Sequence, residues 1–300
     1  MSALRIAPLA LLALGLAAPA LAKDDDKEKW ETRNVADKPV VTLDPAKAYI
    51  LVQSEVAVTP YFMRQPSAEE AAKHAADRAE ELTKEHDKWV KKHASWVKTM
   101  AGLKGQPANI SRPKEPMEPT EANFSWPRYE TIHPVMMGPQ NRFAKQDGSV
   151  YLQEVPPGDY VYYGNYNGLA GGVCACLGTA SFSAPAGKIV ALRMRLPFFE
   201  AWQAAEKDQR PKDVFDLPES YSTLRLEPGS YADARLPQGM TIPAEFRPAG
   251  QLPNWFGLEV DRLMPIEGVF AYERDKQIDL RAKPPEPLAA PPAAPVAAGQ

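Results

Sequence analysis

Residue types that carry chemistry are scarce in this sequence. Its 300 residues include two cysteines and four histidines. No nucleophile elbow, HExxH zinc motif, phosphate-binding loop or dinucleotide glycine pattern occurs. The absence of these motifs excludes the enzyme classes that depend on them. An enzyme is therefore the less favoured class, and the motifs predict no cofactor and no metal.

A surplus of basic residues and a long apolar segment are also missing. The 35 basic residues face 38 acidic ones, for a net charge of -3, which argues against a nucleic-acid partner because such a partner requires a basic surface. The apolar run over residues 7–18 is too short to cross a bilayer, and no stop-transfer segment follows it. We do not expect a membrane-spanning protein.

The short apolar run has the form of an export signal. Arg5 precedes it, and Ala20-Leu21-Ala22 forms a small-x-small end, so we predict a signal peptide over residues 1–22 with cleavage following Ala22. Residue 23 is lysine, whereas a lipid-anchor signal places a cysteine there. The sequence predicts an exported protein, periplasmic or secreted.

Proline is abundant, with 31 residues, and favours short strands joined by turns over a helix-rich fold. Residues 23–46 begin with a charged run and predict a solvated N-terminal arm. Residues 283–300, rich in proline and alanine, predict a disordered tail. We expect residues 47–282 to form the folded domain, with a helical insertion at 67–104 and a proline-rich connector at 105–130.

The most regular pattern predicts one long helix. Ser67 and Glu70 form a capping box, and Gly102 or Gly105 can end the helix. A heptad-like seam of small, apolar and aromatic residues follows: Ala68, Ala72, Ala75, Ala79, Leu82, His86, Trp89, His93, Trp96, Met100 and Leu103. Two arrangements stay open. The helix packs along its own β-domain, or it is a coiled-coil arm that pairs with a second copy or another protein.

The C-terminal half of the seam carries most of its apolar surface. The residues expected at a helix interface are Trp89, Trp96, Met100 and Leu103. His86 and His93 are about 10.5 Å apart along a helix, too far for one metal ion to bridge. We therefore expect both histidines to pack against the tryptophans.

The remaining sequence predicts strands. Residues 48–58 form an apolar run that stops at the prolines of 60–66, and "SVYLQEV-PPGDY-VYYGNYNG" and "TASFSA-PAGK-IVALRMRL" predict two hairpins with type II turns. The pairing of V-P-P-G-D-Y with F-S-A-P-A-G-K-I, over about residues 148–195, resembles the hairpins of prealbumin-like sandwich domains in uncharacterised bacterial envelope proteins. The resemblance implies a non-enzymatic domain of the cell envelope.

The expected fold class is mainly β, or α+β overall: an antiparallel β-sandwich with a long inserted α-helix and disordered termini. Within it, Tyr160 and Tyr162 share one face of a predicted strand. Their rings could stack against a sugar, although tyrosine also suits a half-buried strand for packing reasons alone.

Cys174 and Cys176 are the second candidate set. In a regular strand their Cα atoms would be about 6.4 to 6.8 Å apart with parallel side chains, so a disulfide between them requires a distorted strand. The glycines that flank the pair permit such a distortion. Buried free thiols, or a Cu(I) site with Met136 and Met137, are the alternatives.

Together these features predict an exported, non-catalytic protein of the cell envelope that binds or scaffolds. The helix at 67–104 would serve a homodimer or a partner, such as an envelope protein or a glycan. One alternative is a periplasmic thiol-redox or Cu(I)-handling protein that uses Cys174 and Cys176. The third is an envelope hydrolase whose catalytic pair comes from distant residues.

Overall fold

The computed structural model describes residues 30–107, 109–145, 148–165, 173–196, 224–252, 261–274 and 276–282. Contacts divide the chain into two units, Met1–Trp30 and Glu31–Gln300, and every described helix and strand belongs to the second. The predicted signal peptide and the predicted C-terminal tail lie outside the described residues.

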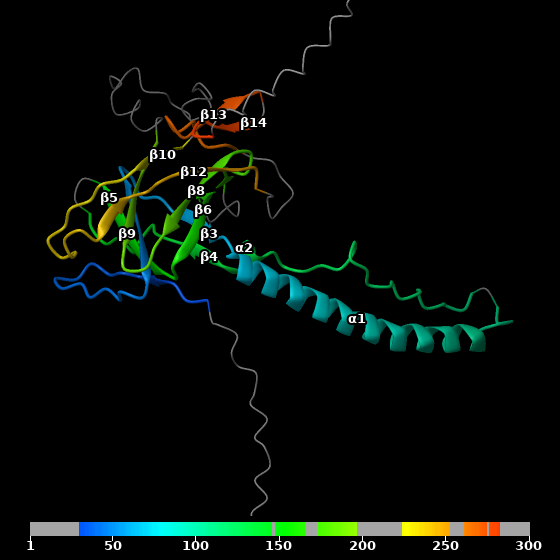
Figure 1. The fold of residues 1–300 in the computed structure, drawn as a ribbon. Helices are drawn as coiled ribbons and strands as arrows, with labels where there is room; N and C mark the ends of the chain where they lie inside the picture. The colour runs from blue at the N-terminus through cyan, green and yellow to red at the C-terminus, as the bar shows by residue number, and fades with distance from the viewer. Residues whose placement is uncertain are drawn as a thin grey trace, which may run out of the picture. The chain divides into compact units, whose positions relative to one another are not determined.

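The first sheet has the strand order β1-β5-β2-β9-β10, and β11 pairs with the other half of β9 (Figure 1). Its strands are β1 (Arg33–Asn34), β2 (Ala48–Ser54), β5 (Ser149–Val155), β9 (Ile189–Arg195), β10 (Arg225–Pro228) and β11 (Thr241–Pro243). β9 pairs in parallel with β2 and β11, and the other pairs are antiparallel. Central β2 is buried along nearly its whole length, which is why its sequence is a continuous apolar run.

The second sheet has the order β12-β8-β6-β3-β4, and β7 pairs with the far end of β6. Its strands are β3 (Pro60–Arg64), β4 (Pro134–Met136), β6 (Gly158–Asn165), β7 (Val173–Cys174), β8 (Thr179–Ala184) and β12 (Arg247–Gly250). The strand pairs described in this sheet are antiparallel. Proline is tolerated at position 60 because it is the first residue of β3. The expected stop after residue 58 is therefore wrong: β2 ends at Ser54, and Pro60 opens the next strand.

A small third sheet pairs β13 (Phe270–Glu273) with β14 (Lys276–Asp279). The Gln277 side chain joins it to the second sheet, because its Nε2 donates to the carbonyl of Thr179 at 2.8 Å and its Oε1 accepts from the amide of Gly250 at 2.6 Å. One amide thus completes the backbone hydrogen bonding of β8 and β12.

The two predicted hairpins are wrong. β5 lies in the first sheet and β6 in the second, and the same separation holds for β9 and β8. The turn at Pro185 forms as expected: Lys188 N donates to Pro185 O at 3.2 Å, and Gly187 has φ 69°. It nevertheless carries the chain from one sheet to the other. The local pattern predicts the turn, but the partner of each strand is distant in the sequence.

The described part of the predicted N-terminal arm, residues 30–46, is mostly exposed but lies against the first sheet. β1 pairs with β5, and Val35, Val41 and Leu43 pack against the buried cluster on one face of the first sheet. These three half-buried side chains hold the segment against the sheet.

The long helix α1 (Ala68–Gly102) begins at the predicted capping box, in which the Ser67 side chain accepts from Glu70 N and the Glu70 side chain accepts from Ser67 N. Its C-cap is Leu103. The short helix α2 (Tyr129–Ile132) precedes β4. Because β3 and β4 pair with each other, residues 67–128 form an excursion between adjacent antiparallel strands. We call these residues the β3–β4 insertion.

Candidate functional site

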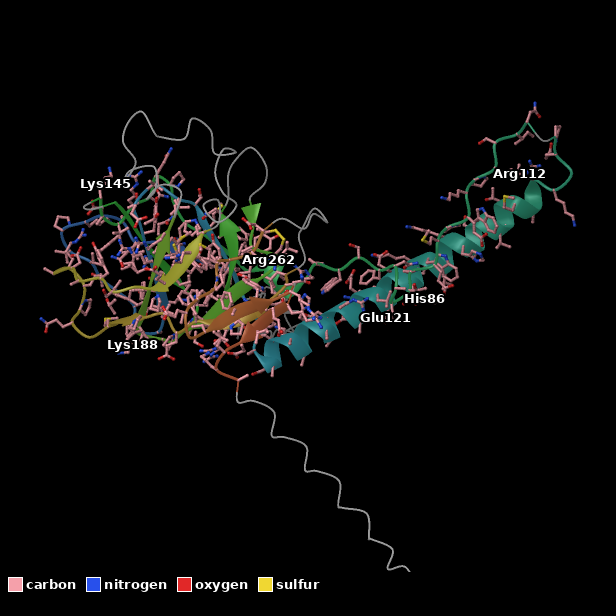
Figure 2. All side chains as sticks on the ribbon, turned by 90° about the horizontal axis from the view of Figure 1, so that it is seen from above. His86, Arg112, Glu121, Lys145, Lys188 and Arg262 are labelled. Carbon is pink, nitrogen blue, oxygen red and sulfur yellow. A yellow bond between two sulfur atoms is a disulfide. The ribbon has the colours of Figure 1, made fainter. Side chains whose placement is uncertain are left out.

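The connector lies antiparallel along α1 within the β3–β4 insertion. Contacts along its length pair Trp126 with His74, Glu121 with Arg78, Glu118 with His86, Pro116 with Trp89, Glu115 with His93 and Pro113 with Trp96. Figure 2 shows this segment returning beside the helix from Arg112 to Glu121. Proline suits it, because an extended strand without a sheet partner has no need of its N–H donors.

Four rings form a continuous row on the helix face under the connector. Centroid distances are 5.4 Å from His86 to Trp89, 4.9 Å from Trp89 to His93 and 5.6 Å from His93 to Trp96. The indole N–H groups of Trp89 and Trp96 donate to the carbonyls of Pro116 and Pro113 at 3.0 and 2.9 Å. The expected packing of histidine against tryptophan is confirmed.

The predicted seam matches the covered face of α1 only in its C-terminal half. Trp89, Trp96, Met100 and Leu103 are half-buried, whereas Ala68, Ala72, Ala75 and Ala79 are exposed. In the N-terminal half Leu82 is the one seam residue that is half-buried, and the other half-buried residues include Glu70, His74 and Arg78. An alanine side chain is too short to reach the connector, so longer side chains one or two positions away make the contact.

Arg64 ties the insertion to the second sheet. Its guanidinium donates to the Glu70 carboxylate, to the Tyr129 hydroxyl and, at 3.2 Å, to the Pro157 carbonyl. Burial alone would raise the pKa of Glu70, but hydrogen bonds from Arg64 and Ser67 lower it to about 2. The first turn of α1 is thereby anchored on β3.

Cys174 and Cys176 form a close pair whose Cα atoms are 5.0 Å apart. The chain turns out of the strand here, since β7 ends at Cys174, and this is the distortion that the sequence spacing requires. Both side chains are buried, 1% and 3% exposed, in a cluster with Met63. A partner thiol has little access to such sulfurs.

Tyr160 and Tyr162 are not ligand-stacking residues. They are 0% and 2% exposed, and their rings pack against Phe182 and Phe62. Both residues are core side chains of β6, because this strand is covered on both faces rather than on one.

A cleft of about 870 Å³ lies at the end of β2. Its lining comes from five segments: Asp37; Gln53, Ser54 and Glu55; Ala144, Lys145, Ser149 and Val150; Arg193; and residues 231–235. Its size falls within the range of small-molecule sites. None of these residues is a sequence candidate for function.

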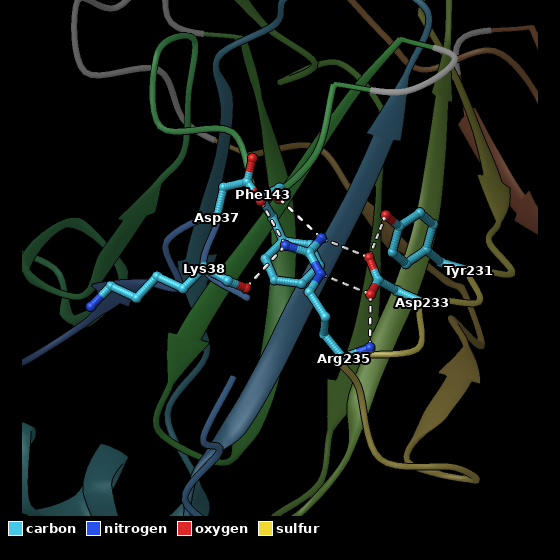
Figure 3. Close-up of polar contacts among 6 residues, drawn as sticks. All are labelled: Asp37, Lys38, Phe143, Tyr231, Asp233 and Arg235. Carbon is cyan, nitrogen blue, oxygen red and sulfur yellow. Dashed lines mark hydrogen bonds and ion pairs between the residues drawn. The ribbon is translucent and has the colours of Figure 1, made fainter. Parts of the chain in front are cut away.

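Arg235 organises one wall of the cleft, as Figure 3 shows. Its Nε and Nη2 donate to the two carboxylate oxygens of Asp233 at 2.9 and 2.7 Å, and Nη1 donates to Asp37 Oδ1 at 2.6 Å. The guanidinium carbon lies 4.3 Å from the centroid of the Phe143 ring, and the Tyr231 hydroxyl donates to Asp233 at 3.2 Å. Arg235 therefore joins the N-terminal segment, the loop before β5 and its own loop.

The contacts among Arg235, Asp233 and Tyr231 set the protonation states of these three side chains. Hydrogen bonds from Arg235 lower the pKa of the Asp233 carboxyl to about 2. The same interaction raises the pKa of the Arg235 guanidinium. Burial and the Asp233 charge raise the pKa of Tyr231. The wall thus presents an ion pair and a neutral phenol at neutral pH. An Asp-x-Arg spacing in a loop is the one sequence signal for it, and it is too common to identify a site.

Ser54 and Glu55, which line the cleft, each hold one buried polar atom without a partner in the described part of the chain. Among the described residues nothing hydrogen-bonds Ser54 Oγ or Glu55 Oε2. Ser54 is 4% exposed. The other oxygen of Glu55 accepts from Arg193 at 3.3 Å. Elsewhere in the described ranges, Arg64 Nε, Gln153 Oε1 and Asn165 Oδ1 are likewise buried without a partner and lie outside the cleft, so this feature does not by itself mark a binding site.

Comparisons with known proteins leave the family open. The chain matches no family model, and it has no significant match among curated proteins or solved structures. Within the described ranges no helix combines the length and apolar character needed to cross a membrane. The same ranges contain no cluster of three or more metal-binding side chains.

Proposed function

We propose that this protein is an exported, non-catalytic binding or scaffolding component of the bacterial cell envelope, and that the β3–β4 insertion contacts its partner. Export rests on the leader at residues 1–22 and its Ala20-Leu21-Ala22 end. The placement in the envelope rests on the predicted export, since the resemblance over residues 148–195 was carried by hairpins that do not form. We further propose that the two large sheets pack face to face as a sandwich, since β8 of one lies beside β2 and β9 of the other.

One observation carries the role of the insertion. α1 has 35 residues, and none of its described residues is buried, so it contributes little to the core of its own domain. Helices of this kind draw most of their stability from packing of an apolar face. The connector supplies only part of that packing, and a partner would supply the rest.

The part of α1 beside the connector face offers a surface for that partner. Val90, Ala94, Val97 and Ala101 are exposed at alternating spacings of four and three residues, and the two valines are each 47% exposed. This spacing suits packing against another helix. The partner we propose is therefore a helix, from a second copy of this chain or from another envelope protein.

The Cys pair supports the same function class. We propose that Cys174 and Cys176 form a structural disulfide, because both sulfurs are buried in an apolar cluster. A redox or Cu(I) role would require accessible thiolates. Nothing described in the structure favours a hydrolase.

The test is a surface variant that leaves the fold unchanged. V90K/V97K places two charges on the exposed stripe of α1 while it leaves the contacts under the connector in place. We expect it to lower self-association in light scattering, or capture of an envelope protein, by at least tenfold relative to wild type. K91A/K98A is the matched control, since it changes the next residue along the helix at the same spacing.

A second variant separates folding from binding. A short Gly-Ser linker replaces residues 76–124 and joins Ala75 to Ser125, next to His74 and Trp126, whose ring nitrogens lie 3.0 Å apart. We expect the β-sheet signal and the cooperative unfolding to survive, and association to disappear. Wild-type protein that stays monomeric at high concentration and recovers no partner through the insertion would refute the proposed role.

A further inference from the structure

The C-terminal half of α1 and the loop that follows it are strongly basic. Residues 88–114 contain seven lysine or arginine residues and no aspartate or glutamate, although the whole chain has a net charge of -3. Figure 2 shows Arg112 beside the end of α1 that is remote from its anchor at Glu70, and the 35 residues of this helix span about 50 Å. A local excess of one charge in an acidic chain favours a partner of the opposite charge.

Most of these cations are not neutralised within the insertion. Lys88 pairs with Glu85 at 2.5 Å, and Lys92 interacts with Glu85 at longer range. The connector carboxylates nearest to this segment face His93 and His86. Within the described ranges no ion pair includes the other six cations, and all six are exposed: Lys91, Lys92, Lys98, Lys104, Arg112 and Lys114. We call these six residues the basic end of the insertion.

The lysines of α1 occupy a side of the helix that no other contact uses. Lys91 and Lys98 each follow a tryptophan of the seam by two positions, which places them about 160° around the helix from the connector face. Each also follows a valine of the exposed stripe by one position, which is about 100° around the helix. A partner on the lysine side therefore leaves room for the connector and for a helix on the valine stripe.

The spread of the cations points to an extended anionic partner. Lys91 and Lys98 are about 10 Å apart along the axis, and Lys104 and Arg112 lie past the last residue of α1. One small anion cannot contact cations so far apart, whereas a flat array of phosphate groups can.

Exposed apolar side chains at the same end favour a lipid surface over a soluble polyanion. Ile110 is 37% exposed and Met117 is 76% exposed, and they lie two and three residues from Arg112 and Lys114. Cations beside exposed apolar side chains are typical of segments that bind the membrane interface. A phosphate polymer would contact the cations but would offer nothing to the two apolar side chains.

We propose that the basic end of the insertion binds an anionic phospholipid surface. The six cations approach the phosphate headgroups, and Ile110 and Met117 contact the boundary with the acyl chains. One cation near such a surface strengthens binding by about fivefold, so attachment depends on several acting together. This inference concerns the same insertion but does not rest on the helical partner proposed above.

The experiment is flotation of the full-length mature protein with lipid vesicles. One set is an equal mixture of phosphatidylglycerol and phosphatidylcholine, and the other is phosphatidylcholine alone. We expect binding to the anionic vesicles only, and we expect it to weaken as salt is added because salt screens exposed charges. Equal binding to both sets, or binding to neither, overturns the proposal.

A triple variant locates the binding surface. K104Q/R112Q/K114Q removes three cations of the basic end and should weaken vesicle binding by about tenfold or more. The matched control is K38Q/K145Q/K276Q, which makes the same change of net charge at exposed lysines outside the insertion and should bind as wild type does. Neither variant alters a buried residue, so both should keep the wild-type melting temperature. Equal losses in the two variants would show attraction to the whole chain and overturn the proposal.

A further variant separates a lipid surface from a polyanion. I110S/M117S should weaken binding to anionic vesicles and leave binding to soluble polyphosphate unchanged. Unchanged vesicle binding in I110S/M117S, together with polyphosphate binding as tight as vesicle binding, would identify a polyanion as the partner and overturn the proposal.

The two proposals for the insertion can fail separately. K91A/K98A should weaken vesicle binding and keep the association measured without lipid, because it changes only the lysine side of α1. V90K/V97K should do the reverse, since it adds two cations and changes only the valine stripe.

Discussion

Arg235 shows how much of the described structure can depend on one side chain. It makes a bidentate pair with Asp233, a bond to Asp37 and contacts to the carbonyls of Lys38 and Phe143. A lysine at this position could not replace the planar fork, which also stacks on the Phe143 ring. Because the contacts join segments that are far apart in the sequence, they order the loops around the cleft.

We predict that Arg235→Met destabilises the protein by about 2 to 3 kcal/mol, because it leaves the half-buried Asp233 carboxylate without its cation. Urea unfolding followed by circular dichroism measures the loss. Arg281→Met serves as the control, since Arg281 is exposed and forms an ion pair with Asp279, two residues away; it should stay within about 0.5 kcal/mol of wild type. Equal stability of the two variants would contradict the role given to Arg235.

At the scale of elements, α1 and the connector form a unit in which a helix packs against an extended strand of its own chain. The row of His86, Trp89, His93 and Trp96 supplies the packing, and two indole N–H groups supply directed bonds to the connector. The connector covers part of the aromatic half of the helix, a contact that neither expectation for the seam included. Pairing with a second copy or another protein stays a prediction.

We predict that W89A/W96A releases the connector from α1. The variant should be cleaved faster by protease within residues 109–128, while the β-sheet signal and the melting temperature of the strands stay near those of wild type. The reason is that neither tryptophan belongs to the buried core. W89F/W96F is the control: it keeps an aromatic ring at each position but removes the indole donors and part of the ring area, so an intermediate cleavage rate is expected. A change of oligomeric mass in W89A/W96A would instead identify the seam as an interface between copies.

At the scale of the whole molecule, two carboxylates with low pKa values hold parts of the fold together at separate places. Glu70 anchors the insertion to β3 through Arg64, and Asp233 closes the loop beside the cleft through Arg235. Each has a pKa of about 2 in the folded protein, below the usual value of 4.5 for Glu70 and 3.8 for Asp233. A carboxylate whose pKa is lowered on folding stabilises the folded state above its unfolded pKa and loses that effect as the pH falls toward 2.

We therefore predict that Glu70 and Asp233 make a constant contribution to the free energy of unfolding near neutral pH. This contribution falls between about pH 4.5 and pH 2. E70Q/D233N should be less stable than wild type at pH 6 and should show a shallower fall in this window. Urea unfolding at a series of pH values measures both effects. Glu69→Gln, a change at an exposed position of the same helix turn, should follow the wild-type curve, and an E70Q/D233N curve parallel to wild type would contradict the prediction.

Local signals in the sequence were sufficient for local structure. The capping box at Ser67, the turn at Gly187 and the strand-rich character of residues 48–282 follow from short-range sterics and hydrogen bonding, and the structure contains them. The contact of histidines with tryptophans on one helix face also follows from spacing alone. These features depend on residues within about one turn or one strand of each other.

Tertiary structure decided the rest, because it depends on contacts between segments that no local pattern links. The strands beside Pro157 and Pro185 read as hairpin partners, yet β5 and β9 find their partners in β2, and β6 and β8 pair in the other sheet. The seam reads as an interface, yet the connector returns to cover its aromatic half. The cleft has no motif at all: Ser54, Glu55 and Arg235 meet only because β2 ends where a loop more than 170 residues later is held by ion pairs. Sequence determined which elements form, and burial and charge pairing over long distances determined where they lie.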